Sequence, residues 1–208
     1  MRRGGVGAAR PVPSDGRRGR PVCSARGAAV TFTEEWFGPG SCLDLAGLVE
    51  DVEDVPGLII EIGSWEGRST IAIANACRPR VVHAVDTWKG SAGEPSEVLA
   101  ARRDVFATWQ ANITEQTAGN VQAHRCDWRF YLESLNRADP PTVAFVFIDA
   151  EHDFQSVYDC IAAVRPFMAE GGIICGDDIH HPPVISAVFE SFPDEPIQQL
   201  GPIWARRL

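Results

Sequence analysis

The 208-residue sequence predicts an α/β domain with a doubly wound, mostly parallel seven-stranded sheet and a C-terminal antiparallel hairpin. Three observations support this fold class. Short apolar runs alternate with segments of helical period along the chain. A glycine-containing turn follows the first strongly apolar run, and several runs end in acidic residues. Because ligands of doubly wound sheets bind where the parallel strands end, these turn and acidic residues form the candidate site.

The run Leu58–Ile62 predicts a strand buried on both faces. It is followed by Gly63, Gly67 and a predicted helix over Arg68–Cys77. Glycines let the backbone approach a ligand closely, and a helix start offers free N–H groups, so this unit is typical of a nucleotide cradle. Its spacing, Glu61-x-Gly63-x-x-x-Gly67, matches neither a dinucleotide fingerprint nor a phosphate-binding P-loop. The acidic Glu61 favours a ligand that carries a cation; a purely structural tight turn is the alternative.

The segment before this strand predicts two short helical pieces, Thr33–Trp36 and Leu43–Val55, with Ser41 as N-cap of the second. Trp36 and Phe37 either cover the ligand as a lid or anchor the segment to the core. After the cradle, Val81–Val85 predicts a second strand.

This second strand ends in Asp86, which lies 19 residues after Gly67. An acidic residue at that position hydrogen-bonds ribose hydroxyls in nucleotide-binding βαβ units. The glycine turn therefore makes a ribose contact the favoured role for Asp86 over a merely solvated strand end. After the third strand, Asp127 either caps the next helix or meets a base edge, and the sequence leaves both roles open.

The later elements continue the alternation of strands and helices. The predicted helices are Glu94–Thr117, Phe130–Leu135, Phe154–Phe167 and Pro182–Phe189, and the predicted strands are Val121–Arg125, Thr142–Ile148, Gly171–Gly176, Ile197–Leu200 and Ile203–Leu208.

Carboxylates follow the fourth and fifth strands, which are neighbours in such a sheet. Asp149, Asp177 and Asp178 should therefore converge, and a divalent cation such as Mg²⁺ would offset their repulsion. Adjacent strand residues point to opposite faces, so Asp177 and Asp178 both bind metal only if the strand has ended before them. The alternative is that one of them caps the next helix.

Histidine follows on the same rim. His152 lies three residues after Asp149 and can accept a proton near neutral pH. A lone histidine at a helix start is more often solvated, but the adjacent carboxylates and the expected cleft make a catalytic role an even alternative. His180 and His181 are weaker candidates for substrate contacts.

Charge is divided unevenly along the chain. Residues 1–30 hold seven Arg and one Asp, whereas the remaining 178 residues carry a net charge of −15, which makes the body a poor partner for nucleic acid. We expect residues 1–30 to be a disordered tail and residues 31–208 to form a single domain. A nucleic-acid-binding tail, a transit peptide and upstream sequence read from an early start codon remain alternatives. Six scattered cysteines without a C-x-x-C pair indicate reduced thiols and a cytoplasmic protein, and the sequence has no run long enough to span a membrane.

Together, the Glu61–Gly67 spacing, Asp86, Asp127, the FIDAEHDF segment and the GGIICGDDI segment resemble class I S-adenosylmethionine-dependent methyltransferases. The resemblance is to the metal-dependent O-methyltransferases related to catechol and to macrolide- or aminocoumarin-sugar methyltransferases. It runs from about Leu58 to the C-terminus. The region before Leu58, with which family members build the substrate pocket and the oligomer, is short here.

The resemblance implies a role for each site residue. Glu61, Gly63, Gly67 and Ser69 would hold the methionine moiety of S-adenosylmethionine, Asp86 the ribose, and Asp127 and Trp128 the adenine, with Ser64, Trp65 and Thr87 also beside the cofactor. Asp149, Asp177 and Asp178 would hold Mg²⁺, with His152 and Asp149 as the catalytic residues. The acceptor would be a hydroxyl of a small molecule such as a sugar or another natural product, and a homo-oligomer is compatible.

Two rival functions remain. An NAD-dependent oxidoreductase predicts G-x-G-x-x-G, which is absent, and leaves the three aspartates unexplained. A non-catalytic cofactor-binding protein with a nucleic-acid-binding tail predicts that deletion of residues 1–30 abolishes function, whereas an enzyme would keep its turnover.

Overall fold

The computed structural model describes residues 32–208. Its α-helices are α1 (Pro39–Glu50), α2 (Arg68–Ala76), α3 (Pro95–Ala100), α4 (Val105–Gln116), α5 (Trp128–Leu135), α6 (Phe154–Val164) and α7 (Pro182–Ser191). Its strands are β1 (Leu58–Ile62), β2 (Val82–Asp86), β3 (Val121–Arg125), β4 (Val143–Ile148), β5 (Met168–Gly176), β6 (Gln198–Leu200) and β7 (Ile203–Arg207). A short 3₁₀ turn, Arg165–Phe167, joins α6 to β5.

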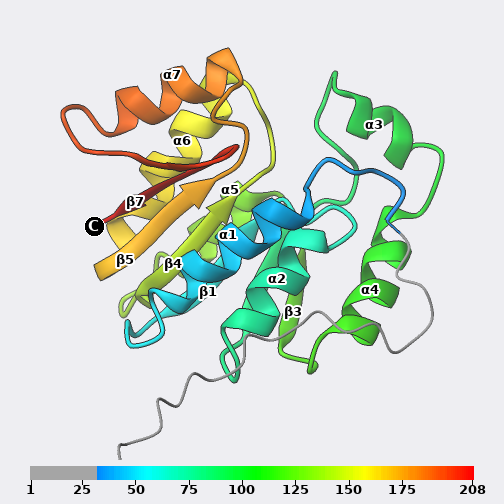
Figure 1. Cartoon of the computed structure of the whole chain (residues 1–208), viewed down its shortest axis with the longest axis horizontal. Coiled ribbons are helices and arrows are strands. Elements are labelled where there is room, and N and C mark those ends of the chain that lie inside the picture. Colours follow the sequence, from blue (N-terminus) through cyan, green and yellow to red (C-terminus); the bar gives the residue numbers. More distant parts are fainter. Residues whose placement is uncertain (1–31) are drawn as a thin grey trace, which may run out of the picture.

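These strands form one seven-stranded sheet in the order β3-β2-β1-β4-β5-β7-β6 (Figure 1). Strands β1 to β5 are parallel, and β7 pairs antiparallel with both β5 and β6. The predicted fold class is therefore confirmed. Ile62 is in register with Val85 on one side and with Ile148 on the other, and Ile148 is in register with Gly176. The last residues of four parallel strands consequently meet along one edge of the sheet.

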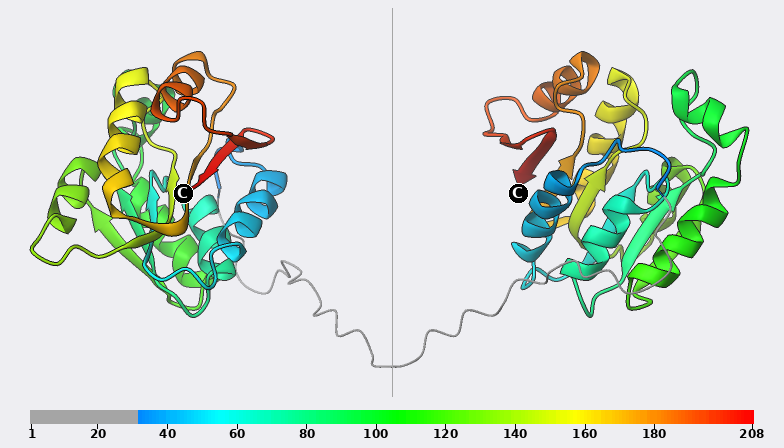
Figure 2. Two further views of the ribbon diagram at one scale, coloured as in Figure 1. Left: turned by 90° about the vertical axis from the view of Figure 1, so that its left-hand side faces the viewer. Right: turned by 45° about the vertical axis from the view of Figure 1, so that its right-hand side comes forward.

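Helices cover both faces of the sheet, as Figure 2 shows. Apolar residues of α1 and α2 pack with Ile59, Phe145 and Phe147 on one face, and residues of α4 pack with Ala84 of β2. Residues of α5, α6 and α7 pack with Ile60 and Val146 on the other. Strand β4 is buried along its whole length because alternate side chains enter the two cores.

Two of the predicted helices are wrong in detail. Thr33–Trp36 is irregular, and the backbone N–H and the hydroxyl of Thr33 both donate to the Glu66 carboxylate, a contact from 33 residues away along the chain. The next helix is capped by Gly38 with Pro39 at its first position, so Ser41 lies inside α1 and is not the N-cap.

The predicted helix Glu94–Thr117 is also divided. It splits into α3 and α4 because Asp104 caps a new helix, its side chain accepting from the backbone N–H of Ala107. The predicted tail of residues 1–30 lies outside the described residues. Within residues 32–208, no helix has the length and apolar character needed to cross a membrane.

The neighbouring strands β2 and β3 each contribute one histidine to a stacked pair. The rings of His83 and His124 are stacked with centroids 5.1 Å apart, and Nδ1 of His83 is 3.0 Å from Nε2 of His124. Tyr131 of α5 covers the His124 ring at 4.6 Å. Burial lowers the pKa of both histidines, and His83 lowers the pKa of His124 further. Two nitrogens in contact require one donor and one acceptor, so the pair is incompatible with two imidazolium rings.

This pair should make the fold sensitive to acid. Folded-state pKa values lie below the unfolded value of about 6.5, so the unfolded chain binds more protons as the pH falls. The associated stability is present above about pH 6.5 and is lost below it. Glu61 and Asp177, whose pKa values are raised to about 7, act in the opposite direction over this range, so the effect of the pair is read from a comparison of two proteins. We expect the free energy of unfolding, measured in urea at about pH 8 and about pH 5.5, to change less favourably on acidification in the native chain than in His124→Gln. An equal change in the variant would contradict this origin.

Candidate functional site

The candidate site lies at the edge where β1, β2, β4 and β5 end. Gly63 follows β1 at a positive φ of 87°, and a Cβ there would lie 1.9 Å from the carbonyl oxygen of Asp149. Gly67, at φ 90°, is the N-cap of α2. Only glycine permits the close approach at Gly63, so the turn after β1 lies directly against the chain after β4.

Glu61 lies beneath this turn and not on its open side. The side chain is fully buried, and Oε2 accepts hydrogen bonds from the hydroxyls of Ser64, at 2.7 Å, and Thr70. Oε1 is buried without a hydrogen-bond partner among the described residues. Burial raises the pKa of Glu61 to about 7. Glu61 therefore shapes the turn, and Oε1 is the one atom it can still offer to a ligand.

Asp86 fastens the same turn to the end of β2. Oδ2 accepts from the backbone N–H of Ser64 at 2.7 Å and of Trp65 at 2.9 Å, and Oδ1 accepts from the N–H of Trp88 at 2.6 Å. Burial raises the pKa of Asp86. The neighbouring Thr87 hydroxyl accepts from the N–H of Lys89. Asp86 thus lies at the end of β2 and organises the turn, while its contact with a ribose stays a prediction.

The end of β3 carries the residues predicted at the adenine. Asp127 caps α5 by accepting from the N–H of Arg129 at 2.8 Å. Trp128 is buried, and its Nε1 donates to Glu151 at 3.0 Å. The capping role that the sequence left open is therefore present, while contact with a base stays a prediction.

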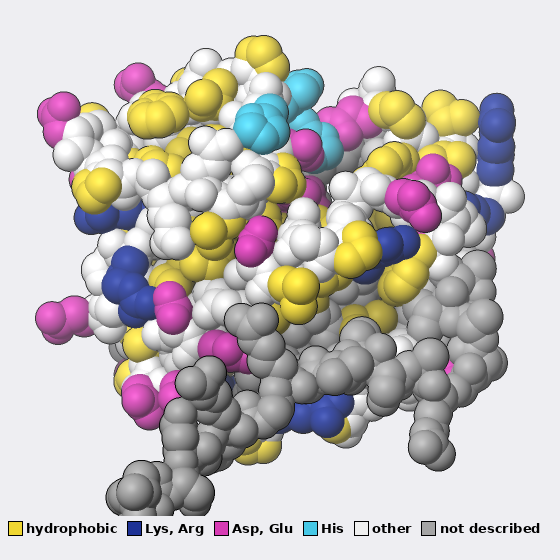
Figure 3. All heavy atoms as spheres, in the orientation of Figure 1, with side chains coloured by type: hydrophobic (Ala, Val, Ile, Leu, Met, Phe, Trp, Pro, Cys, Tyr) yellow, Lys and Arg dark blue, Asp and Glu magenta, His cyan; other side chains and the backbone are white. Residues whose placement is uncertain are grey.

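Acidic and histidine side chains gather where β4 and β5 end (Figure 3). One ligand atom each from Asp149, His152 and Asp178 lies within 4.8 Å of the others. Nε2 of His152 is 2.9 Å from Asp178 and 3.8 Å from Asp149. Strand β5 ends at Gly176, and Asp178 has a positive φ of 59°, so the two aspartates are freed from strict strand alternation. The structure thus brings His152 to two of the three predicted metal ligands, whereas Asp177 lies outside this group.

The charges of this cluster partly compensate one another. The adjacent carboxylates of Asp149 and Asp178 raise the pKa of His152 to about 11, which favours the protonated imidazole at neutral pH. Contact with His152 lowers the pKa of Asp178, while burial raises the pKa of Asp149 and raises that of Asp177 to about 7. Oδ1 of Asp177 is buried without a hydrogen-bond partner among the described residues. The carboxylates of Asp149 and Asp178, with the unsatisfied oxygen of the neighbouring Asp177, are a donor set that fits a hard divalent cation.

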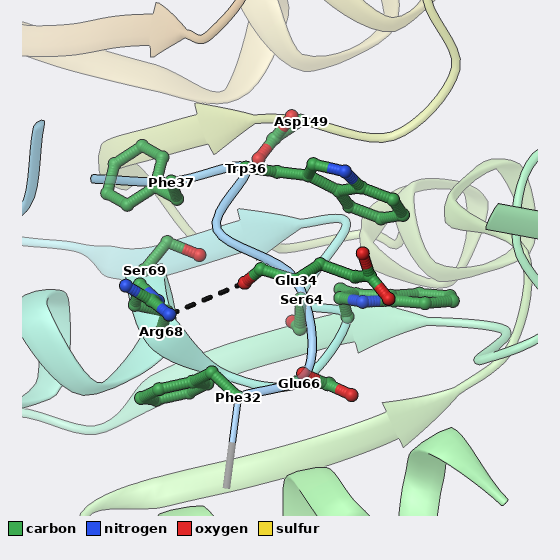
Figure 4. Close-up of a pocket in the computed structure, with 10 residues that line it drawn as sticks. Phe32, Glu34, Trp36, Phe37, Ser64, Glu66, Arg68, Ser69 and Asp149 are labelled. Carbon is green, nitrogen blue, oxygen red and sulfur yellow. Dashed lines mark hydrogen bonds between the residues drawn. The ribbon is translucent and has the colours of Figure 1, made fainter. Parts of the chain in front are cut away.

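A cavity of about 60 Å³ opens beside the glycine turn (Figure 4). It lies under the N-terminal strap, which we define as residues 32–37. Trp36 is 54% exposed whereas Phe37 is 7% exposed, so the strap both covers the cavity and anchors to the core. The cavity is lined by Phe32, Glu34, Trp36, Phe37, Ser64, Trp65, Glu66, Arg68, Ser69 and Asp149.

The strap is held by an ion-paired residue that the sequence analysis missed. Glu66, inside the turn, accepts from Thr33 and pairs with Arg103 at 3.1 Å, and Arg103 also lies 3.6 Å from Glu34. Glu94, which contacts His152, was missed as well. Both contacts span long stretches of chain, so no local pattern marks them.

Gly63→Ala should destabilise the fold strongly, because the new Cβ meets backbone and the φ is left-handed. We expect a loss of about 3 kcal/mol or more in the free energy of unfolding, measured by chemical denaturation. Gly119→Ala is a matched control, since Gly119 has φ 79° with no atom within 4 Å of its Cβ position, and should cost about 1 kcal/mol. Equal losses in the two variants would contradict the steric argument.

Known proteins share this fold. NovP, an O-methyltransferase, superimposes with a TM-score of 0.61 at 22% identity, over 82% of this chain and 80% of NovP. CalS11, a TDP-rhamnose 3′-O-methyltransferase of calicheamicin biosynthesis, superimposes with a TM-score of 0.59 at 20% identity, over 80% of this chain and 78% of CalS11. At these identities the likeness establishes the fold.

A curated relative matches a smaller part. The tRNA (guanine-N(7)-)-methyltransferase of Nocardioides sp. is 37% identical over 101 residues, 41% of each protein, so the chain spans about two-fifths of that relative's length. The family described as a methyltransferase domain matches residues 60–179, which is more than half of the chain and includes the glycine turn and the acidic cluster. The chain therefore belongs to the methyltransferase domain family, and its fold is the class I methyltransferase fold that the sequence predicted.

Proposed function

We propose that this protein transfers a methyl group from S-adenosylmethionine to a hydroxyl of a small molecule, such as a sugar or another natural product, in a Mg²⁺-dependent reaction. The observation that carries this proposal is the position of the Asp149–His152–Asp178 cluster directly beside the glycine turn. A cofactor cradle and a cation-binding group share one edge of the sheet, so a methyl donor and an activated acceptor would meet there.

In this proposal the parts of S-adenosylmethionine bind at the ends of successive strands. The methionine moiety would lie at the turn after β1, the ribose at the end of β2 and the adenine at the end of β3. The residues assigned to it are Glu61, Gly63, Ser64, Trp65, Gly67, Ser69, Asp86, Thr87, Asp127 and Trp128. Acidic groups at the turn suit a sulfonium cofactor, which carries a positive charge that NAD lacks at this position.

The acceptor half needs a proton to be removed from a hydroxyl. A divalent cation bound to Asp149, Asp177 and Asp178 would lower the pKa of that hydroxyl. In the present arrangement the carboxylates of Asp149 and Asp178 stabilise the protonated form of His152. His152 can accept the proton once the two carboxylates have another positive partner, so its role as base depends on occupancy of the cation site.

Other substrates fit less well. The tRNA substrate of the partial relative would have to meet a body that carries a net charge of −15 outside the first thirty residues. The predicted cytoplasmic location and homo-oligomer are kept as parts of the proposal.

Calorimetric titration tests the cofactor assignment. We expect S-adenosylmethionine to bind with a dissociation constant in the micromolar range, which corresponds to about −8 kcal/mol, and NAD not to bind. Mg²⁺ should bind the same protein, because the carboxylates supply oxygen ligands. Micromolar binding of NAD in place of S-adenosylmethionine would reject the proposal.

Asp149→Asn should separate catalysis from cofactor binding. The substitution removes one charge of the cation site, so we expect methyl transfer to a panel of sugar and phenol acceptors to fall by about 100-fold, with calorimetric binding of S-adenosylmethionine retained. Asp139→Asn makes the same change in an exposed loop and should leave turnover unaltered. Native turnover in Asp149→Asn would argue against the metal mechanism.

A further inference from the structure

A loop arm reaches from the end of β2 to the acidic cluster. We define this 88–101 arm as Trp88–Ala101, which includes α3. Nδ1 of His152 lies 2.9 Å from Oε2 of Glu94, and the backbone N–H of His152 donates to Oε1 of the same carboxylate at 3.3 Å. One carboxylate thus holds both the ring and the backbone of His152.

Contacts within the 88–101 arm fix its backbone conformation around Glu94. Gly90 has φ 74°, and a Cβ there would lie 2.3 Å from the backbone of Ser96. The N–H of Ser91 donates to the Ser96 hydroxyl, and the N–H of Gly93 donates to Glu97. The arm has a second contact beside the cluster, where the Ser91 hydroxyl donates to the carbonyl oxygen of Ala150 at 3.0 Å. These contacts give the 88–101 arm a defined conformation, and this conformation places Glu94 beside His152.

This contact fixes which ring nitrogen faces the cluster. A histidine nitrogen that donates to a carboxylate sets the orientation of the ring and leaves the other nitrogen for chemistry. Nδ1 is taken by Glu94, and Nε2 lies 2.9 Å from Asp178 and 3.8 Å from Asp149. Without Glu94, rotation about the side-chain torsions would let either nitrogen turn toward the cluster.

We propose that Glu94 is a positioning residue that holds His152 with Nε2 directed at the reaction centre. This inference rests on the proposed function, in which His152 is the base. It assigns Glu94 a role through hydrogen bonding, distinct from a general contribution of negative charge beside Asp149 and Asp178.

Substitutions of Glu94 separate these two roles. Glu94→Gln removes the charge but keeps an oxygen that accepts from Nδ1, whereas Glu94→Ala removes both. Glu97→Gln removes a charge from the same arm without touching His152, and its amide oxygen can still accept from Gly93. It is therefore the matched control for charge.

The test is NMR of the full chain with ¹⁵N-labelled histidine. The Nδ1–H signal of His152, assigned by its loss in His152→Gln, should be visible in the native chain, in Glu94→Gln and in Glu97→Gln, because a hydrogen-bonded N–H exchanges slowly with water. It should vanish in Glu94→Ala. Absence of the signal from the native chain, or its persistence in Glu94→Ala, would overturn the inference.

Methyl transfer to the acceptor panel gives a second readout. Loss of a partner that orients a histidine at a metal-dependent site lowers activity by about 10-fold, which we expect for Glu94→Ala, while Glu94→Gln should stay close to Glu97→Gln. Equal losses in Glu94→Gln and Glu94→Ala would show a charge effect and reject the positioning role. If the native chain binds neither S-adenosylmethionine nor Mg²⁺ but the NMR result holds, the proposed function fails and the positioning of His152 stands.

Discussion

The close approach of β1 and β4 at their ends is the constraint on which the site depends. The N–H of Asp149 donates to the carbonyl oxygen of Ile62 at 2.7 Å, and the absent side chain of Gly63 leaves room for the carbonyl oxygen of Asp149. The cofactor turn and the first residue of the acidic cluster are therefore joined through backbone. Any ligand seated on the turn must lie beside Asp149, so the two halves of the proposed reaction share one rigid junction.

Burial of negative charge at this junction must be compensated locally. Asp86 accepts from three backbone N–H groups, and Glu66 contacts Arg103 and Thr33. Glu61 accepts two hydroxyls on Oε2, while its Oε1 has no hydrogen-bond partner among the described residues. Asp149 and Asp178 depend instead on His152, a group that can exchange its proton. Asp86, Glu61 and Glu66 are thus held by donors that keep their protons and stabilise the fold. The negative charge of Asp149 and Asp178 is compensated by His152, whose place a bound cation could take.

The sequence predicted the sheet well because its signals are local. Apolar runs such as Leu58–Ile62 and the alternation of strands with helices follow from burial and backbone period. Asp149 and Asp178 were found because strand ends of a parallel sheet meet by topology. Asp177 is not part of the Asp149–His152–Asp178 group although it follows the same strand, and Glu94 contacts His152 from 58 residues away along the chain. Neither leaves a mark in the local pattern.

The C-terminal hairpin also contributes to the site, although it carries none of the predicted functional residues. Trp204 of β7 packs against Gly176, where a Cβ would lie 2.8 Å from the indole ring. The N–H of Ile179 donates to the carbonyl oxygen of Pro202 at 2.9 Å, which holds the chain directly after Asp178. The backbone turn that aims Asp178 at His152 is therefore bounded by hairpin contacts on both sides. The antiparallel β6–β7 hairpin therefore positions the Asp178 side of the acidic cluster, as Gly63 positions the Asp149 side.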